Sequence, residues 1–234
     1  MTKAKVATAF VGAAMIFSSC STATGNGALI GTGGGALLGA IVGKLAGNTA
    51  VGAAVGAAVG AGTGAIIGKH MDKVKAETAA KLQNANVTEV TDANGLKAVK
   101  VTFNSGILFG SGNATLSSTA ASELTNFASV LKNNTDCSVA IQGYTDNDPW
   151  KGSTAEQSAQ KNLNLSQQRA DAVKSKLNSL GVSNSQIKSS TGFGEANPVA
   201  DNSSAAGKAQ NRRVEVYLYA SEAMINAANN GSLQ

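Results

Sequence analysis

Glycine recurs at every fourth position over residues 27–68, and this spacing restricts what the segment can fold into. The repeat runs from Gly27 to Gly47, shifts once at residues 48–50, and resumes from Gly52 to Gly68. A period of four places these glycines along one stripe of a helix. Glycine costs a water-exposed helix roughly 1 kcal/mol relative to alanine, so the repeat disfavours a helix surrounded by water.

The cost of glycine in a helix exposed to water does not count against a helix in lipid. In lipid the backbone must satisfy its own hydrogen bonds, and stripes of small residues let two helices approach closely. Each run has about twenty residues, close to one bilayer crossing. We therefore expect residues 27–68 to form a membrane-associated helical hairpin that turns at Asn48, similar to the glycine-zipper segments of some outer-membrane lipoproteins. A flexible Gly/Ala spacer is the alternative, and the Leu, Ile and Val residues between the glycines disfavour it.

The first residues have the pattern of a secretory signal peptide. Lys3 and Lys5 precede an apolar run from Val6 to Phe17 that is too short to span a bilayer. Small residues then precede Cys20, as at a bacterial lipoprotein cleavage site, although Phe17 stands where an aliphatic residue is usual. We expect residues 1–19 to be removed, Cys20 to carry lipid, and residues 20–26 to form a tether. An ordinary signal peptide with an incidental cysteine is the alternative.

The rest of the chain alternates strand-like and helix-like patterns. Asn94-Gly95 lies between two alternating runs, which predicts a β-hairpin. Ser117 can cap the first helix of the domain. The expected elements are a solvated connector helix at 69–86, the hairpin at 87–103, helices at 117–132 and 165–180, strands at 137–144 and 186–192, a last strand from Val214 to Leu218, and a loose tail at 221–234. This order predicts an α/β sandwich with helices over a mixed sheet.

Four short blocks at the ends of these elements carry the polar residues that suggest a function. They run from Gly143 to Asn147, from Leu165 to Ala170, from Gly192 to Glu195 and from Asn211 to Val216. One block carries the carboxylate of Asp146 at the end of a segment, and two others carry guanidinium groups, a pairing that suits a zwitterionic ligand. In this order the blocks resemble the OmpA-like peptidoglycan-binding domain, which implies a βαβαβ(β) fold; we assign the domain to residues 87–220.

The resemblance implies a role for individual residues. Asp146 would bind the ammonium of diaminopimelate in the peptidoglycan stem peptide, and Arg169 the carboxylate on the same carbon. Arginine suits the second task because its planar fork grips a carboxylate with two hydrogen bonds. Thr145, Asn162 and Arg212 match positions that line the site. A structural salt bridge between Asp146 and Arg169 is the alternative. Strand alternation places Arg212 and Arg213 on opposite faces, so at most one of the two should point at the site.

Two features depart from the family pattern. Tyr144 stands where the family usually has histidine, and it keeps a ring with a hydrogen-bonding group. The spacing of 23 residues between Asp146 and Arg169 is longer than usual. The excess falls within residues 148–161, which include the only tryptophan, Trp150. This segment could be a lid or an extra wall of the site; a surface loop with its ring packed on the domain is the favoured reading.

Composition argues against several other functions. The net charge of +5 includes two lysines of the expected signal peptide, so it gives no reason to expect nucleic acid as a partner. His70 is the only histidine, and Cys20 and Cys137 are the only cysteines. If Cys20 carries lipid, Cys137 has no disulfide partner and should be a buried strand residue. We therefore expect no metal site, no cofactor and no catalytic set, and hence no enzyme.

Together these patterns predict a lipoprotein of the outer membrane whose wall-binding domain lies in the periplasm. Its partners would be membrane lipid and peptidoglycan, and its role a noncovalent link between them. One alternative is a homo-oligomeric glycine-zipper assembly or pore tethered to the wall. Another is a stator-like inner-membrane protein, which should carry an acidic residue in the membrane, and residues 27–68 contain none.

Lipidation gives the first test. Cys20→Ala should block processing and leave an unacylated precursor, because no other residue near the apolar run can accept the lipid. Mass spectrometry of the protein extracted from membranes measures this directly. A wild-type protein without acyl mass would contradict the anchor.

Overall fold

The computed structural model describes residues 59–60, 62–92, 95–110 and 112–233. The expected signal peptide, the tether and residues 27–58 of the glycine repeat lie outside this part of the chain, so they stay predictions. Within the described part, no helix combines the length and apolar character needed to cross a membrane.

A five-stranded mixed sheet forms the centre of the domain, as expected from the sequence. The strands are β1 (Ala85–Thr91), β2 (Lys97–Asn104), β3 (Cys137–Gly143), β4 (Ile187–Gly192) and β5 (Arg213–Ala220), in the order β1-β2-β5-β3-β4. All neighbours are antiparallel except β3 and β4, which are joined through a helix. The β1–β2 hairpin is confirmed, and Gly95 adopts a φ of 79° that favours glycine in the turn.

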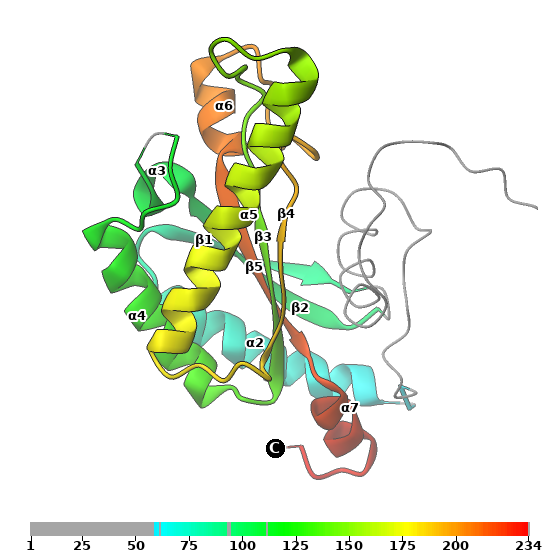
Figure 1. Cartoon of the computed structure of the whole chain (residues 1–234). Helices are drawn as coiled ribbons and strands as arrows, with labels where there is room; N and C mark the ends of the chain where they lie inside the picture. The colour runs from blue at the N-terminus through cyan, green and yellow to red at the C-terminus, as the bar shows by residue number, and fades with distance from the viewer. Residues whose placement is uncertain (1–58, 61, 93–94, 111, 234) are drawn as a thin grey trace, which may run out of the picture. The chain divides into compact units, whose positions relative to one another are not determined.

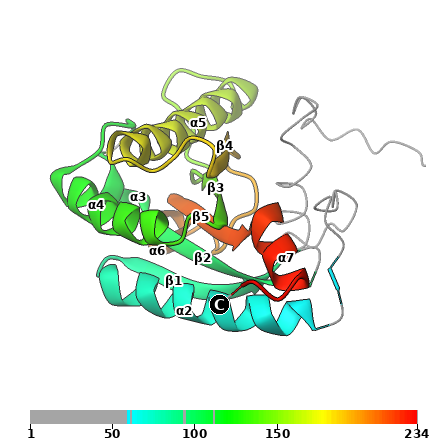
Figure 2. The ribbon, with the colours of Figure 1, turned by 90° about the horizontal axis from the view of Figure 1, so that it is seen from below.

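Three long helices cover one face of this sheet: α2 (Thr63–Lys81), α4 (Ser118–Asn133) and α5 (Ala155–Ser179). Figure 2 shows α2 beside β1 and β2, and α5 beside β3 and β4. Their apolar residues form one core with alternate residues of the strands, such as Val216 and Leu218 of β5. The intervening Tyr217 and Tyr219 lie on the opposite face in a smaller cluster. Ser117 caps α4 as expected, because its hydroxyl accepts a hydrogen bond of 3.0 Å from the Ala120 amide.

The helix expected as a solvated connector at 69–86 is instead part of the domain. Helix α2 begins at Thr63, inside the expected glycine zipper, after Gly62 in a left-handed conformation. It ends at Lys81, and β1 already begins at Ala85. One side of α2 is buried in the core, through residues at helical spacing: Ile67, Met71, Val74 and Thr78. The many charges of this segment lie on the other side of the helix and concealed the apolar stripe.

The expectation of a loose tail at 221–234 is wrong. Residues Glu222–Asn229 form helix α7, and Met224 and Ile225 are fully buried in the main core. The Asn229 side chain accepts hydrogen bonds from the Gly60 amide and the Thr63 hydroxyl, at 2.9 and 2.6 Å, and so ties α7 to the start of α2. A helix of this length is unstable by itself, so its existence depends on tertiary contacts that local sequence does not reveal.

Helix α5 approaches β3 and β4 more closely than any side chain would allow. A Cβ at Gly143 would overlap the backbone carbonyl of Ser166, and a Cβ at Gly192 would overlap the backbone nitrogen of Gln167. The two glycines therefore set the distance between α5 and the sheet.

This contact predicts opposite effects of two Gly→Ala substitutions. Gly143→Ala should lower the free energy of unfolding by about 1–3 kcal/mol or more, because α5 must move away from β3. Gly68→Ala, inside α2, is the matched control, because its Cβ would meet Lys97 Cδ of β2 at an ordinary 3.5 Å. The free energy of unfolding should therefore rise by up to about 1 kcal/mol, since alanine favours a helix more than glycine does. Urea unfolding of a fragment of residues 59–234, followed by circular dichroism, measures both. A Gly143→Ala fragment as stable as wild type would refute the close contact.

Candidate functional site

Three of the four sequence blocks line one open pocket at the end of the sheet where β3 finishes, and the fourth, Gly192 to Glu195, lies behind it, where it binds the Thr145 amide. Figure 1 shows α6 (Ala205–Asn211) and the first turns of α5 at this end of the sheet, and α7 at the opposite end. The pocket has a volume of about 690 Å³. Its lining includes all five residues expected at the site: Thr145, Asp146, Asn162, Arg169 and Arg212. We call it the Asp146 pocket.

Asp146 pairs with Arg212 and not with Arg169. The carboxylate lies just beyond β3, and its Oδ2 accepts a short hydrogen bond from Arg212 Nη1. Its Oδ1 accepts a second hydrogen bond, of 3.2 Å, from the Asp148 amide. Asp146 is almost buried, whereas the Arg212 side chain is 37% exposed. The direct salt bridge considered between Asp146 and Arg169 is not formed in this structure.

Arg169 is buried but incompletely satisfied. Its Nε donates a hydrogen bond of 3.1 Å to the Asn113 carbonyl, and its guanidinium lies 5.3 Å from the centre of the Phe109 ring. Its Nη1 is buried and has no hydrogen-bond partner among the residues that the structure describes. Burial lowers the pKa of Arg169, the nearby Arg212 charge lowers it further, and Asp146 opposes both effects. An arginine stays charged under all these influences, so Arg169 presents a cation with a free donor.

Thr145 adds a second unused polar group to the same pocket. Its backbone amide donates to the Gly194 carbonyl at 2.8 Å, which fixes the residue beside the end of β3. Its hydroxyl oxygen is buried without a hydrogen-bond partner in the described part of the chain. Buried polar groups are normally hydrogen-bonded, so the Arg169 and Thr145 groups together mark a place where a polar ligand fits.

Side chains of α5 next to Arg169 bind β4 and the loop that follows it. The Ser166 hydroxyl accepts a hydrogen bond of 2.8 Å from the Gly194 amide. The Gln167 side chain accepts one of 2.7 Å from the Gly192 amide and donates one of 3.1 Å to the Ser190 carbonyl. Sequence reasoning gave these two residues no role, although their position in the same block as Arg169 was a signal. They hold the helix that carries Arg169.

The block at 211–216 divides its two arginines between the faces of the sheet, as strand alternation predicted. Arg212 lines the Asp146 pocket. Arg213 is buried on the other face, where its Nε donates to Glu215 at 2.8 Å and its guanidinium stacks 3.8 Å from the centre of the Tyr144 ring. Asn211 is fully buried and binds the Val199 and Ala200 amides. Tyr144 therefore contacts Arg213 and not the pocket.

The extra residues between Asp146 and Arg169 lengthen α5. The helix begins at Ala155, ten residues before the predicted start, with Thr154 and Gln157 forming a capping box. Trp150 lies in the loop before this helix with its ring held on the domain, as expected, and it also lines the Asp146 pocket. Its indole N–H donates to Asn162 Oδ1 at 2.7 Å, and the Asn162 amide donates to the Asp148 carbonyl at 3.2 Å. Asn162 thus holds the 148–150 segment as a wall of the pocket.

Comparison with known proteins identifies two segments of the chain. The OmpA family model matches residues 108–212, and a YMGG-like Gly-zipper model matches residues 1–72. The chain is 39% identical over 152 residues to the probable lipoprotein YiaD of Escherichia coli, covering 65% of this chain and 64% of YiaD. It is 38% identical over 112 residues to the peptidoglycan-binding protein ArfA of Mycobacterium tuberculosis, covering 48% of this chain and 32% of ArfA. The chain thus spans less than two thirds of either relative.

A solved structure shares the fold. The cell wall anchor of the T6SS from Pseudomonas aeruginosa superposes with a TM-score of 0.51 and 27% sequence identity. The match covers 64% of this chain and 96% of that one. The α/β architecture expected from the sequence is therefore confirmed, both by the sheet itself and by this likeness.

The burial of an ion pair predicts how much the loss of its carboxylate destabilises the domain. Glu215→Ala should destabilise the domain by about 3–5 kcal/mol, because it leaves Arg213 buried without its charge partner. Asp148→Ala removes an exposed pair with Lys208 and should cost about 0–1 kcal/mol. Urea unfolding of the 59–234 fragment compares the two variants. Equal stabilities would show that the Arg213–Glu215 pair does not support the fold.

Proposed function

Because residues 108–212 form a domain of the OmpA family, we propose that this protein binds peptidoglycan noncovalently and links the outer membrane to the cell wall. The names of the relatives support this proposal: one is a probable lipoprotein, another a peptidoglycan-binding protein, and the similar structure is a cell wall anchor. The observation that carries the proposal is the unused donor of buried Arg169 in the same pocket as the Asp146 carboxylate.

The charges of the pocket fit a ligand with both signs of charge and an excess of carboxylate. Three cationic and two anionic side chains line it: Arg169, Arg212, Lys151, Asp146 and Asp148. A ligand ammonium would bind Asp146, and a ligand carboxylate would accept hydrogen bonds from Arg169 Nη1 and the Thr145 hydroxyl. Arg212 has an exposed side chain and can turn toward the same carboxylate while leaving Asp146 to the ammonium.

Diaminopimelate satisfies these requirements. One carbon of this stem-peptide residue carries an ammonium and a carboxylate, so a single group can meet Asp146 and Arg169 at once. Lysine at the same place in the peptide would keep the ammonium and lack the carboxylate. The pocket should therefore distinguish the two types of wall, since buried Arg169 would stay without an anion when lysine binds. Trp150 and Asn162 would limit the space beside this group.

The membrane side of the link rests on the sequence. Lipid at Cys20 would hold the chain in the outer membrane, and the glycine-rich segment would add a second, embedded anchor. One acyl chain alone gives marginal and reversible attachment, so two anchors together would hold the protein far more firmly. In this role the protein performs no catalysis; it transmits force between two layers of the envelope.

Substitutions in the pocket test the binding site. Asp146→Ala and Arg169→Ala should each weaken binding to diaminopimelate-type peptidoglycan roughly 30-fold or more, since truncating one partner of a desolvated charge pair costs about 2–5 kcal/mol. Arg169→Lys should also weaken binding, because an ammonium cannot reproduce the two-pronged grip. Lys73→Ala, which removes a positive charge from the exposed side of α2, should bind like wild type.

Co-sedimentation of the 59–234 fragment with purified peptidoglycan measures these effects, and circular dichroism checks that each variant is folded. A stem peptide that contains meso-diaminopimelate should compete with the wall for the fragment, and the same peptide with lysine in that place should compete much less. A folded Asp146→Ala variant that sediments like wild type, or equal competition by the two peptides, would overturn the assignment of the site.

A further inference from the structure

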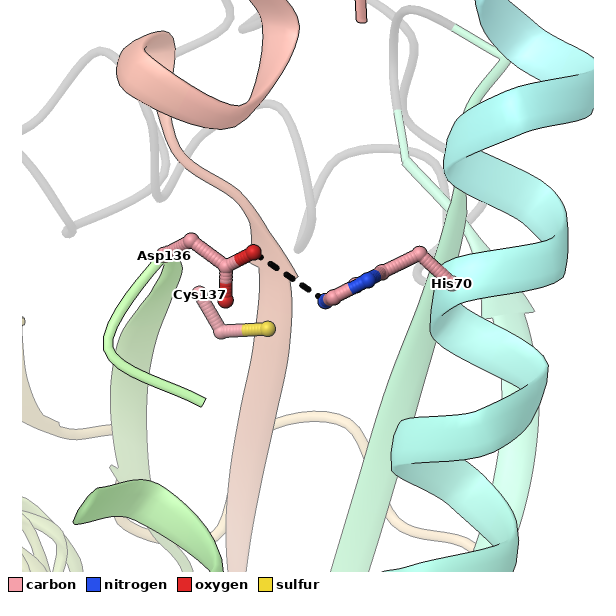
Figure 3. A group of neighbouring side chains, drawn as sticks. All are labelled: His70, Asp136 and Cys137. Atoms are coloured by element: carbon pink, nitrogen blue, oxygen red, sulfur yellow. Dashed lines mark ion pairs between the residues drawn. The ribbon is translucent and has the colours of Figure 1, made fainter. Parts of the chain in front are cut away.

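Helix α2 and the start of β3 bring three metal-ligating side chains together at the end of the sheet opposite the Asp146 pocket. They are His70, Asp136 and Cys137, the His70 cluster (Figure 3). One ligand atom of each lies within 4.8 Å of the other two. A metal site is not expected from the sequence, because His70 lies far from Cys137 along the chain. The fold closes this distance by packing α2 on the sheet.

The contact between His70 and Asp136 is not an ordinary hydrogen-bonded pair. His70 Nε2 lies 3.1 Å from Asp136 Oδ2. Neither ring nitrogen, however, makes a hydrogen bond of acceptable geometry to any described residue, although both atoms are buried. Figure 3 shows the imidazole, the carboxylate and the Cys137 sulfur pointing toward one another. An imidazole held for stability alone would direct its N–H at the carboxylate oxygen, whereas here its edge faces a space that all three groups share.

We propose that the His70 cluster binds a zinc-like divalent cation, with an imidazole nitrogen, a carboxylate oxygen and a thiolate sulfur as protein ligands. In a tetrahedral zinc site, bond lengths of 2.0–2.2 Å place nitrogen and oxygen ligands about 3.4 Å apart, close to the observed 3.1 Å. Nitrogen and sulfur ligands are about 3.6 Å apart, so the sulfur has to approach by at most about 1.2 Å. A water would complete the coordination.

The charges of the His70 cluster suit a divalent cation, and the cation can reach the cluster from solvent. A divalent ion, one thiolate and one carboxylate sum to zero, so the complete site is neutral; a monovalent ion would leave a net negative charge in a largely buried place. Burial raises the pKa of the Cys137 thiol, and the Asp136 charge raises it further. The metal must therefore displace the thiol proton, which leaves to solvent. The Asp136 side chain is 32% exposed, which gives the cation a path into the site.

Binding would clamp α2 to the sheet. Its ligands come from α2 on one side and from the first residue of β3 and the residue before it on the other. Because the unfolded chain does not hold these three groups together, the cation stabilises the folded state. When the free cation is at 100 times its Kd, its binding to the folded state should raise the Tm by roughly 5–10 °C for a domain of this size.

The test uses the full-length mature protein in detergent, freed of metal with a chelator. Zn²⁺ should bind with one equivalent by calorimetry, release protons, and raise the Tm. Co²⁺ should give the near-ultraviolet charge-transfer band of a thiolate ligand. Cys137→Ala should lose this band, and His70→Gln and Asp136→Asn should each lose the Zn²⁺-dependent rise in Tm. Asp72→Asn, which changes an exposed carboxylate of the same helix, should keep both signals.

Two results would overturn the proposal. One is a wild-type protein that shows neither a thiolate–Co²⁺ band nor a change of Tm in excess Zn²⁺. Another is a Zn²⁺-dependent rise in Tm that persists in His70→Gln and Asp136→Asn. These two variants keep the size of the side chains, so they decide the question even if Cys137→Ala fails to fold. Because the His70 cluster is remote from the Asp146 pocket, none of these measurements depends on wall binding.

Discussion

The contact of helix α5 with two glycines of the sheet determines the geometry of the proposed binding site. Gly143 and Gly192 leave no side chain between the strands and the backbone of α5 at Ser166 and Gln167. The Ser166 side chain can then bind the loop after β4, and the Gln167 side chain can bind β4 itself. Arg169, one turn further along, lies beside the end of β3 where Asp146 emerges. Any group larger than hydrogen at these glycines would move α5 and separate the two charges.

Arg169 and Arg213 are both buried, but only Arg213 is fully provided with partners. Arg213 has the Glu215 carboxylate, two backbone carbonyls and the face of Tyr144. Arg169 has one carbonyl and one ring, and a donor that no described residue uses. A buried cation without a close anion is costly unless a ligand supplies the missing charge. This contrast supports the proposed binding role of Arg169 and agrees with a structural role for Arg213.

Much of the fold could be predicted because local patterns and tertiary structure agree. The hairpin at Asn94-Gly95, the cap at Ser117 and the grouping of Asp146 with Arg169 all follow from short-range signals and the topology of an α/β sheet. The failures have physical causes. The apolar stripe of α2 was concealed by surrounding charges, α7 exists only through tertiary contacts, and the early start of α5 depends on a capping box at Thr154 in a segment without strong hydrophobic periodicity. The His70 cluster joins residues that only the folded chain brings together.

In the proposed link between membrane and wall, both proposed sites would lie on the path along which the domain transmits force. The wall pocket lies beyond the carboxyl end of β3, and the His70 cluster lies at its amino end, so the strand connects them through the centre of the sheet. A pull from the membrane would reach the domain at the N-terminal end of α2, where the hydrogen bonds of Gly60 and Thr63 to Asn229 of α7 are partly exposed. A helix loaded at one end peels from that end first. A cation bound at His70, two turns into α2, would resist this peeling at the place where the load enters the domain.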